Sequence, residues 1–373
     1  MDKKRILQLA WRNFLFYLSR KIDYPLIAPD VAQVNFTFRC NLRCKMCSMY
    51  DRLISFKSQG RPYELDVESI KKTIREASEM GISYLILIGG EPFLEPRIFE
   101  LISFANQFGM RGITVVSNGT LFSREMIEKI FESNLSNLSV SIDAATEETF
   151  AKIRGENVLK KIIDNLNLLN ELKEKENRSI PNIVCVCTIM DQNLEELMDI
   201  VYLCKKLKIS RIIFQPVVGD NTNQSRVDFS SSIFIPKNRF EILDKSIDAL
   251  ISYKLSSKED FDLVANNLKH LKLIKRYFKG RLKPQEIPCY VGYNRIQVAQ
   301  EGKIYFCVNQ DKHISTFGDI RQDNLKDLWF SDKAKFYRNL IRKCGFSCLQ
   351  WCAYRDDFIE LQGIWQKRHY FKN

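Results

Sequence analysis

The sequence lacks the features that mark several classes of protein. Histidine is rare, with 3 in 373 residues, and the 11 cysteines fall below the density of a small, disulfide-stapled secreted fold. There is no internal repeat and no low-complexity tract. Hydrophobic residues at 45% and charged residues at 27% exclude wholesale disorder, a collagen-like repeat and a polytopic membrane protein. We therefore expect a soluble, folded protein, long enough for about two to three domains.

The N-terminal segment lacks a secretion signal. Its apolar run from Ile6 to Leu18 follows basic residues, but Gln8, Arg12 and Asn13 interrupt it and no small-residue cleavage site follows. We expect a cytoplasmic protein with reduced thiols, in which clustered cysteines indicate metal binding or catalysis.

Acidic residues are fewer than basic ones. The chain has 57 Lys and Arg against 45 Asp and Glu, a net charge of +12, which favours an anionic partner. A phosphorylated or carboxylated substrate and an acidic membrane surface both fit this charge. Nucleic acid is not expected as a partner, because the basic residues occur without a recognisable recognition module.

The segment from Val31 to Gln215 alternates short β-rich runs with longer helical patterns, which is typical of strand-helix units around a parallel sheet. The expected strands are residues 33–38, 84–88, 113–117, 138–142, 183–190 and 211–215. Apolar residues at three- and four-residue spacing predict helices over residues 66–80, 123–133, 158–175 and 194–208. The pattern predicts an α/β fold with a partial (β/α)6 barrel, whose chemistry lies at the carboxyl ends of the strands.

The rest of the chain follows other patterns. Two helices, residues 238–254 and 258–279, indicate a connector, and a hairpin through residues 298–308 is expected to turn at Glu301-Gly302. The expected domains are an N-terminal helix and extension (1–30), the barrel core (31–229), the helical connector (230–284) and a cysteine-bearing α+β domain (285–373).

Directly after the first expected strand, Cys40, Cys44 and Cys47 form the pattern C-x-x-x-C-x-x-C. Three soft thiolates on one short loop suit three irons of a four-iron cluster and leave the fourth iron open. A structural zinc site is the alternative, but it usually needs four ligands, and no histidine or fourth cysteine lies nearby.

This loop resembles the signature of the radical S-adenosylmethionine (radical SAM) superfamily, whose fold is a partial barrel. Gly89-Gly90-Glu91-Pro92 is similar to the family's GGEP motif, which receives the methionine amino group, and Ser117-Asn118 to its loop near the ribose and carboxylate. The resemblance assigns further cofactor-binding roles to Met46 and Gln215 at the adenine and to Ser141 and Arg154 at the ribose or carboxylate. It also assigns Asp143, in the S-x-D element that Ser141 begins, to the cofactor-binding residues.

A second group of cysteines lies in the last part of the chain. Cys289 and Cys307 form C-x12-G-x4-C around Gly302, which resembles the opening of a SPASM or twitch domain that binds auxiliary four-iron clusters. The closing cysteines, Cys344, Cys348 and Cys352, are spaced differently from that pattern. Five thiols favour one auxiliary [4Fe-4S] cluster, with a zinc site or ordinary buried cysteines as alternatives.

Three other cysteines, Cys185, Cys187 and Cys204, are expected in the core. The inward-facing member of the pair Cys185 and Cys187 would touch the active-site cavity.

The resemblance implies an enzyme that cleaves SAM reductively to a 5′-deoxyadenosyl radical, which abstracts a hydrogen atom from a peptide or a small anionic substrate. It also implies a reductant such as flavodoxin or ferredoxin. One alternative is a non-catalytic iron-sulfur scaffold or electron carrier. Another is a membrane-associated radical SAM enzyme with a lipid-linked substrate, because the helix expected from Arg5 to Ser19 has a broad aromatic face with basic flanks.

Overall fold

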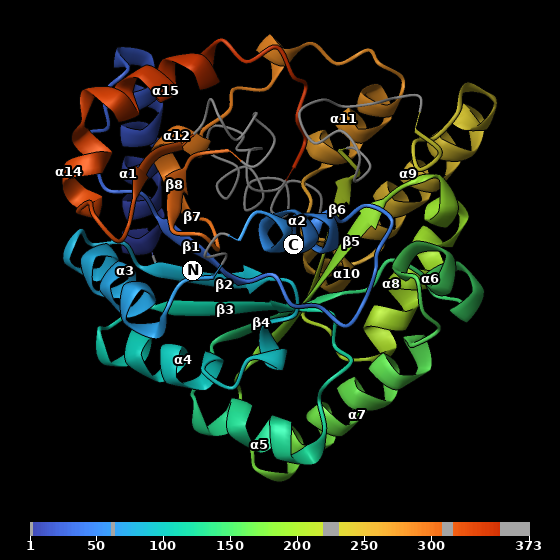
Figure 1. Ribbon diagram of the computed structural model, residues 1–373. Helices are drawn as coiled ribbons and strands as arrows, with labels where there is room; N and C mark the ends of the chain where they lie inside the picture. The colour runs from blue at the N-terminus through green and yellow to red at the C-terminus, as the bar shows by residue number, and fades with distance from the viewer. Residues whose placement is uncertain (1–2, 61–63, 219–230, 308–315, 351–373) are drawn as a thin grey trace.

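The computed structural model describes residues 3–60, 64–218, 231–307 and 316–350 and confirms the expected α/β architecture (Figure 1). Its nine-stranded sheet has the order β6-β5-β4-β3-β2-β1-β7-β8-β9. Six strands are parallel and follow the chain order: β1 (Val31–Thr37), β2 (Tyr84–Gly89), β3 (Gly112–Ser117), β4 (Asn137–Ser141), β5 (Asn182–Ile189) and β6 (Arg211–Pro216). All six expected strands are present, with ends shifted by at most two residues.

Helices connect these strands and cover the outer side of the curved sheet, where Figure 1 shows α3, α4, α5, α7 and α8. The helices of this part are α1 (Lys3–Ile22), α2 (Met49–Ser58), α3 (Val67–Glu79), α4 (Ile98–Gln107), α5 (Arg124–Glu132), α6 (Glu147–Arg154), α7 (Leu159–Lys175) and α8 (Leu197–Lys206). The first three residues of the helix expected over residues 194–208 belong instead to a 3-10 turn, η2 (Asp191–Glu196). The strand-helix order is that of a partial barrel.

Side-chain caps fix where several helices begin. The Asp66 carboxylate accepts a hydrogen bond from the backbone N–H of Ser69 at 2.7 Å, and Ser123 and Thr146 cap α5 and α6 in the same way. Such caps satisfy backbone donors that have no partner within the helix. The serine, threonine and aspartate residues that precede the apolar repeats therefore set the helix boundaries.

The central strands have two different faces. In β5, buried residues alternate with half-buried ones from Ile183 to Ile189. Cys185 and Cys187 both belong to the buried set, and Cys185 meets Cys204 of α8 through a hydrogen bond between their side chains. Residues two positions apart in a strand share a face. Both thiols therefore lie on the side covered by helices, and the expectation that one of them faces the barrel interior is wrong.

The connector has three helices where two were expected. They are α9 (Phe240–Ser256), α10 (Lys258–Leu263) and α11 (Leu268–Phe278). The long predicted helix is interrupted because Val264 forms a parallel bridge with Ile212 at the edge of β6. Asn267 then starts α11 by accepting a hydrogen bond from the N–H of His270 at 2.7 Å. An asparagine at this place favours a new helix start over a continuous helix.

The C-terminal region extends the same sheet. It contains α12 (Val291–Asn294), β7 (Arg295–Val298), β8 (Lys303–Tyr305), β9 (Thr316–Asp319), α14 (Leu325–Phe330) and α15 (Asp332–Arg342). The expected hairpin is present, with Gly302 at φ 85° in its turn, but β7 also pairs in parallel with β1. The last β-strands therefore continue the barrel sheet, which a local sequence pattern does not reveal because parallel partners are distant in the chain.

Helix α1 packs on the C-terminal region with one face only. Phe16 is buried against Tyr290 and Tyr293, and the Arg20 side chain donates to the backbone oxygen of Cys289 at 3.1 Å. The opposite face exposes Leu7, Trp11, Phe14 and Tyr17. Among the helices of the described residues, none is both long and apolar enough to cross a bilayer.

Candidate active site

Cys40, Cys44 and Cys47 lie in the loop that joins the carboxyl end of β1 to α2. A hydrogen bond of 3.0 Å from the N–H of Cys47 to the backbone oxygen of Cys44 turns the chain between the last two cysteines. Cys40 and Cys47 are exposed, whereas Cys44 is buried. The loop thus lies at the edge of the sheet where parallel strands place their chemistry.

The three thiols influence one another. Removal from water raises the pKa of Cys40 to about 11, and the neighbouring charges of Cys44 and Cys47 raise it further. Within the described residues, no three His, Cys, Asp or Glu side chains are already gathered as a metal-binding group. The donor set nevertheless fits an iron-sulfur cluster, because three thiols follow one another on one loop and can lose their protons when they bind iron.

The Gly89-Gly90-Glu91 segment lies directly against the cysteine loop. The N–H of Gly90 donates to the oxygen of Thr37 at 2.8 Å, and the N–H of Glu91 donates to the oxygen of Arg39 at 2.7 Å. A Cβ atom added to Gly90 would lie 2.0 Å from the Arg39 oxygen. Only glycine permits this approach, so the two loops are joined through their backbones.

Glu91 joins the second loop to the third. It is fully buried, and its carboxylate accepts hydrogen bonds from the Ser117 hydroxyl at 2.9 Å, the N–H of Asn118 at 2.7 Å and the N–H of Phe93 at 3.1 Å. Burial raises the pKa of Glu91 to about 7, against the effect of these hydrogen bonds. Pro92 starts the short 3-10 helix η1 (Pro92–Leu94) immediately after it.

Two further residues of the site were not singled out by the sequence analysis. Asn41, within the cysteine motif, accepts from the Asn118 amide at 2.8 Å and donates to the Thr120 hydroxyl at 2.8 Å. The Thr120 hydroxyl also donates to the side-chain Oδ1 atom of Asn118 at 2.7 Å. The sequence signal that could have identified Asn41 and Thr120 is their position inside or next to a recognised motif. Together they connect the cysteine loop to the loop after β3.

Arg154 and Gly155 bring the end of α6 onto the cysteine loop. The buried Arg154 guanidinium donates to the Cys44 thiol at 3.4 Å and forms an ion pair with Asp143. Asp143 is itself buried and accepts from the N–H of Thr188 at 2.7 Å. The Nε atom of Arg154 is buried without a hydrogen-bond partner. The structure thus places Arg154 beside a cysteine thiol with a donor left over.

The remaining cofactor-binding candidates occupy the same edge of the sheet. Ser141 and Gln215 are half-buried at the carboxyl ends of β4 and β6. Met46, between the second and third cysteines, is half-buried and packs against the core. All three lie where a ligand above the strand ends would meet them.

The C-terminal cysteines come from separate elements. Cys289 precedes α12, Cys307 follows β8 and Cys344 follows α15, and all three are half-buried, as is Cys348. Within the described chain, these four are not gathered as one metal-binding group. Cys352 lies outside the described residues.

Three contacts attach the segment around Cys348 to the barrel. Gln350 donates to the backbone oxygen of Pro216 at 2.6 Å, and Ser347 donates to that of Leu282 at 2.5 Å. The buried His270 ring contacts the oxygen of Leu349 at 3.1 Å through its Nε2 atom. These contacts place the cysteine segment near the carboxyl end of β6 and near α11.

Comparison with known families agrees with this arrangement. The profile described as the radical SAM superfamily matches residues 34–225, and the SPASM profile, described as an iron-sulfur cluster-binding domain, matches residues 289–354. These ranges contain the two groups of cysteines.

Curated relatives have different activities. The chain is 34% identical to a protein named Fe-coproporphyrin III synthase from Methanosarcina barkeri over 49% of this chain and 43% of the relative. It is 35% identical to AdoMet-dependent heme synthase from the same organism over 34% of this chain and 35% of the relative. The chain therefore matches less than half the length of these two proteins. GTP 3′,8-cyclase from Aquifex aeolicus is 25% identical over 87% of this chain and 95% of the relative.

Solved structures share the fold. Streptococcus suis SuiB has a TM-score of 0.62 at 17% identity, covering 87% of this chain and 71% of its own. The protein named anSMEcpe, solved with AdoMet and a peptide, has a TM-score of 0.61 at 13% identity, covering 92% and 96%. With both family profiles matched, the chain belongs to the radical SAM superfamily as an enzyme with a SPASM domain, and its cofactors are a [4Fe-4S] cluster with SAM and auxiliary iron-sulfur clusters.

Proposed function

We propose that Cys40, Cys44 and Cys47 bind the [4Fe-4S] cluster at which this enzyme cleaves SAM to generate a radical that removes a hydrogen atom from its substrate. The observation that carries this proposal is the attachment of the cysteine loop to the Gly90-Glu91 loop through two backbone hydrogen bonds of 2.8 and 2.7 Å. Three thiols leave one iron open for SAM, which a closed structural site would not.

Side chains around the loop have separate tasks in this proposal. Gly89 and Gly90 let their loop pack against the backbone of Thr37 and Arg39, beside the cysteines, while Glu91 fixes that loop against Ser117 and Asn118. The spare Nε donor of the buried Arg154 is available to an anion beside the cluster. The cofactor-binding roles are assigned to Met46, Gly89, Gly90, Glu91, Pro92, Ser117, Asn118, Ser141, Asp143, Arg154 and Gln215.

We propose one auxiliary [4Fe-4S] cluster in the C-terminal domain, held by thiols of Cys289, Cys307, Cys344, Cys348 and Cys352. Five thiols are too few to close two four-iron clusters. The domain borders expected at residues 30, 229 and 284 are part of the same proposal. The match of the SPASM profile to residues 289–354 supports it.

We propose a peptide or a small anionic molecule as the substrate. A peptide is supported by SuiB, solved with its precursor peptide at a TM-score of 0.63, and a small anion by the relatives named for GTP and coproporphyrin. Arg52 of α2 supports an anionic group on either substrate, because its Nε atom is buried without a hydrogen-bond partner. Its guanidinium lies 5.2 Å from the centre of the Phe38 ring, next to the cysteine loop.

The test is a dithionite-reduced assay in which 5′-deoxyadenosine is detected by mass spectrometry. Deuterated peptides and deuterated small anions, prepared as separate fractions of a cell extract, are offered in turn. Deuterium in the deoxyadenosine from one fraction identifies the substrate class, and flavodoxin or ferredoxin is then substituted for dithionite. A loaded protein that yields no deoxyadenosine with any fraction would contradict the proposal and favour an iron-sulfur scaffold.

We also propose a peripheral membrane contact of this enzyme through α1, which would bring it to a lipid-linked substrate. The observation that favours it is the apolar face of α1, where Leu7 is 70% and Trp11 is 62% exposed between the exposed Lys4 and Lys21. An apolar face with basic flanks is typical of helices that lie on anionic lipid. The cytoplasmic location stays a prediction.

Sedimentation with vesicles tests this contact. The wild type is expected to bind vesicles containing phosphatidylglycerol and to bind phosphatidylcholine vesicles less well. A Trp11→Ser/Phe14→Ser variant should lose that binding, whereas Phe336→Ser, at an exposed aromatic of α15, should keep it. Equal binding of both variants would contradict a contact through α1.

A further inference from the structure

The short segment from Phe36 to Arg39 contains the last two residues of β1 and leads from the sheet into the cysteine loop. The register between β1 and β2 shifts between Asn35 and Thr37. Beyond Thr37, the Arg39 oxygen is the acceptor that joins this segment to Glu91. Because the peptide group of that oxygen leads directly into Cys40, its position also decides where Cys40 lies relative to the Gly90-Glu91 loop.

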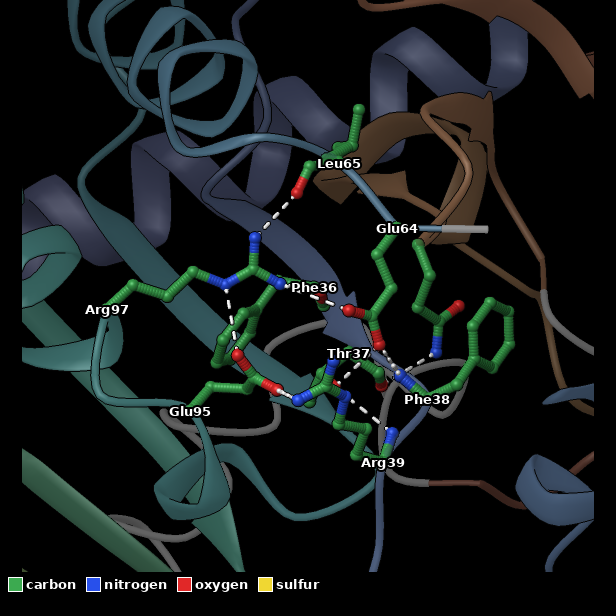
Figure 2. A network of polar contacts seen from close by, with 9 residues as sticks. Phe36, Thr37, Phe38, Arg39, Glu64, Leu65, Glu95 and Arg97 are labelled. Atoms are coloured by element: carbon green, nitrogen blue, oxygen red, sulfur yellow. Dashed lines mark hydrogen bonds and ion pairs between the residues drawn. The ribbon is translucent and has the colours of Figure 1, made fainter. Parts of the chain in front are cut away.

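Glu64, which precedes α3 in the chain, fixes this segment from the side (Figure 2). One of its oxygens accepts from the Thr37 hydroxyl at 2.8 Å and from the N–H of Phe38 at 2.9 Å. The Thr37 hydroxyl in turn accepts from the N–H of Arg39 at 3.0 Å. The Glu64 side chain is 13% exposed. One carboxylate therefore orders the backbone of two residues immediately before Cys40, in a place with little competing water.

Arg97, just before α4, binds the same segment from the other side (Figure 2). Its guanidinium donates to the backbone oxygens of Leu65 at 2.7 Å and Phe36 at 3.3 Å, and to the second Glu64 oxygen at 3.4 Å. Its Nε atom also lies 3.5 Å from Glu95. A planar guanidinium with five donors can hold several acceptors in fixed directions, which a lysine cannot.

Glu95 completes the network by an ion pair with Arg39 at 3.1 Å. The two glutamates and two arginines balance in charge. Glu64 and Arg97 themselves contact the segment before the cysteines and not the thiols. Their effect on the site therefore acts through the backbone of residues 36–39.

We propose that Glu64 and Arg97 are positioning residues for SAM binding: they fix Phe36 to Arg39 so that Cys40 and the Gly90-Glu91 loop keep the separation that SAM requires. This inference rests on the proposed function, in which the cysteine loop binds the cluster and the glycine loop binds SAM. A small displacement between two groups that share one ligand lowers its affinity without removing either group.

The test uses the reconstituted, full-length protein and measures SAM binding, not turnover. SAM is titrated while the electron paramagnetic resonance signal of the reduced cluster is followed, iron per chain is counted, and thermal unfolding is recorded. The variants are Glu64→Ala, Glu64→Gln, Arg97→Met and Arg97→Lys. The matched control is Arg338→Met, since Arg338 is another buried arginine that donates to two backbone oxygens, those of Gly292 and Trp329, both at 2.7 Å.

We expect Glu64→Ala and Arg97→Met to weaken SAM binding roughly 10-fold or more while the cluster is retained. Glu64→Gln keeps an acceptor oxygen and should lose less affinity than Glu64→Ala. Arg338→Met should lower the unfolding temperature but bind SAM as the wild type does.

Wild-type SAM affinity in both Glu64→Ala and Arg97→Met, whatever their stability, would overturn the inference. If these variants do not retain the cluster, SAM affinity is compared in Glu64→Gln and Arg97→Lys instead. Wild-type SAM affinity in both of these variants would also overturn the inference. Failure of the proposed function is distinguishable, because a variant lacking all three loop cysteines would then keep the SAM-dependent signal.

Discussion

The loop of Cys40, Cys44 and Cys47 places three thiols within eight residues, whereas the C-terminal cysteines are spread from residue 289 to residue 352. Contacts from the ends of β2, β3 and α6 surround the first group. The second group depends on distant partners, such as His270, which contacts Leu349 across 79 positions in the sequence. A compact loop carries its donor set in its own sequence, whereas a dispersed set requires the tertiary fold to be in place first.

The strongest test of this contrast is Cys44→Ala. Loss of one thiol from a three-thiol site should abolish deoxyadenosine formation, because the cluster then lacks an iron ligand and the Arg154 guanidinium loses its contact with the Cys44 thiol. Mass spectrometry of the reduced reaction measures this. Cys204→Ala, in the buried helix layer, is the control and should keep deoxyadenosine formation. Normal SAM cleavage by Cys44→Ala would refute the assignment of the loop.

Cys348→Ala should distinguish the function of the C-terminal cysteines from that of the Cys40, Cys44 and Cys47 loop. We expect SAM cleavage to persist while the substrate product is lost and about four irons per chain disappear, because the auxiliary cluster would serve the substrate step only. Iron analysis and product detection on the same preparation check this. Unchanged iron content would instead assign Cys348 to packing.

Gly90 and Gly345 also distinguish the two regions, because only Gly90 lies in close contact with another loop. Gly90→Ala would place a Cβ atom 2.0 Å from the Arg39 oxygen, which must push the two loops apart, and SAM affinity should fall roughly 100-fold. Gly345→Ala, between two C-terminal cysteines, meets nothing within 4 Å and should change SAM affinity little. Equal effects of the two substitutions in a SAM titration would contradict the close approach of the loops.

The smallest expected effect concerns His270, which holds the segment after Cys348. Burial lowers the pKa of His270 to about 4, below its value in the unfolded chain. The unfolded chain therefore binds more protons between about pH 6.5 and 4, and stability falls as pH is lowered through this window, by at most about 3 kcal/mol. Urea unfolding of the wild type and of His270→Gln should show a smaller loss in the variant. The same pH dependence of stability in the wild type and in His270→Gln would contradict this role of His270.

Local patterns were sufficient for much of the fold. Each strand from β1 to β6 combines β-branched residues with flanking turns, and the predicted ends differ from the observed ones by at most two residues. The break between α10 and α11 was missed because it depends on the bridge between Val264 and Ile212, a tertiary contact. The pairing of β7 with β1 was missed for the same reason.

Some residues of the site could be predicted from the sequence and others could not. Cys40, Gly90 and Glu91 stand in recognisable motifs, so the sequence alone identifies them. Glu64 and Arg97 lie outside any motif, and only the folded chain brings them to the segment before Cys40. Residues that act by positioning are defined by long-range contacts and carry no local signature.

The binding of a catalytic cluster by the loop is tested by counting iron and sulfide after anaerobic reconstitution of the wild type and of a Cys40/Cys44/Cys47 triple-alanine variant. We expect about eight irons in the wild type, falling to about four in the variant, together with loss of deoxyadenosine. A variant that keeps all its iron and still forms deoxyadenosine would contradict the central claim that this loop binds the catalytic cluster.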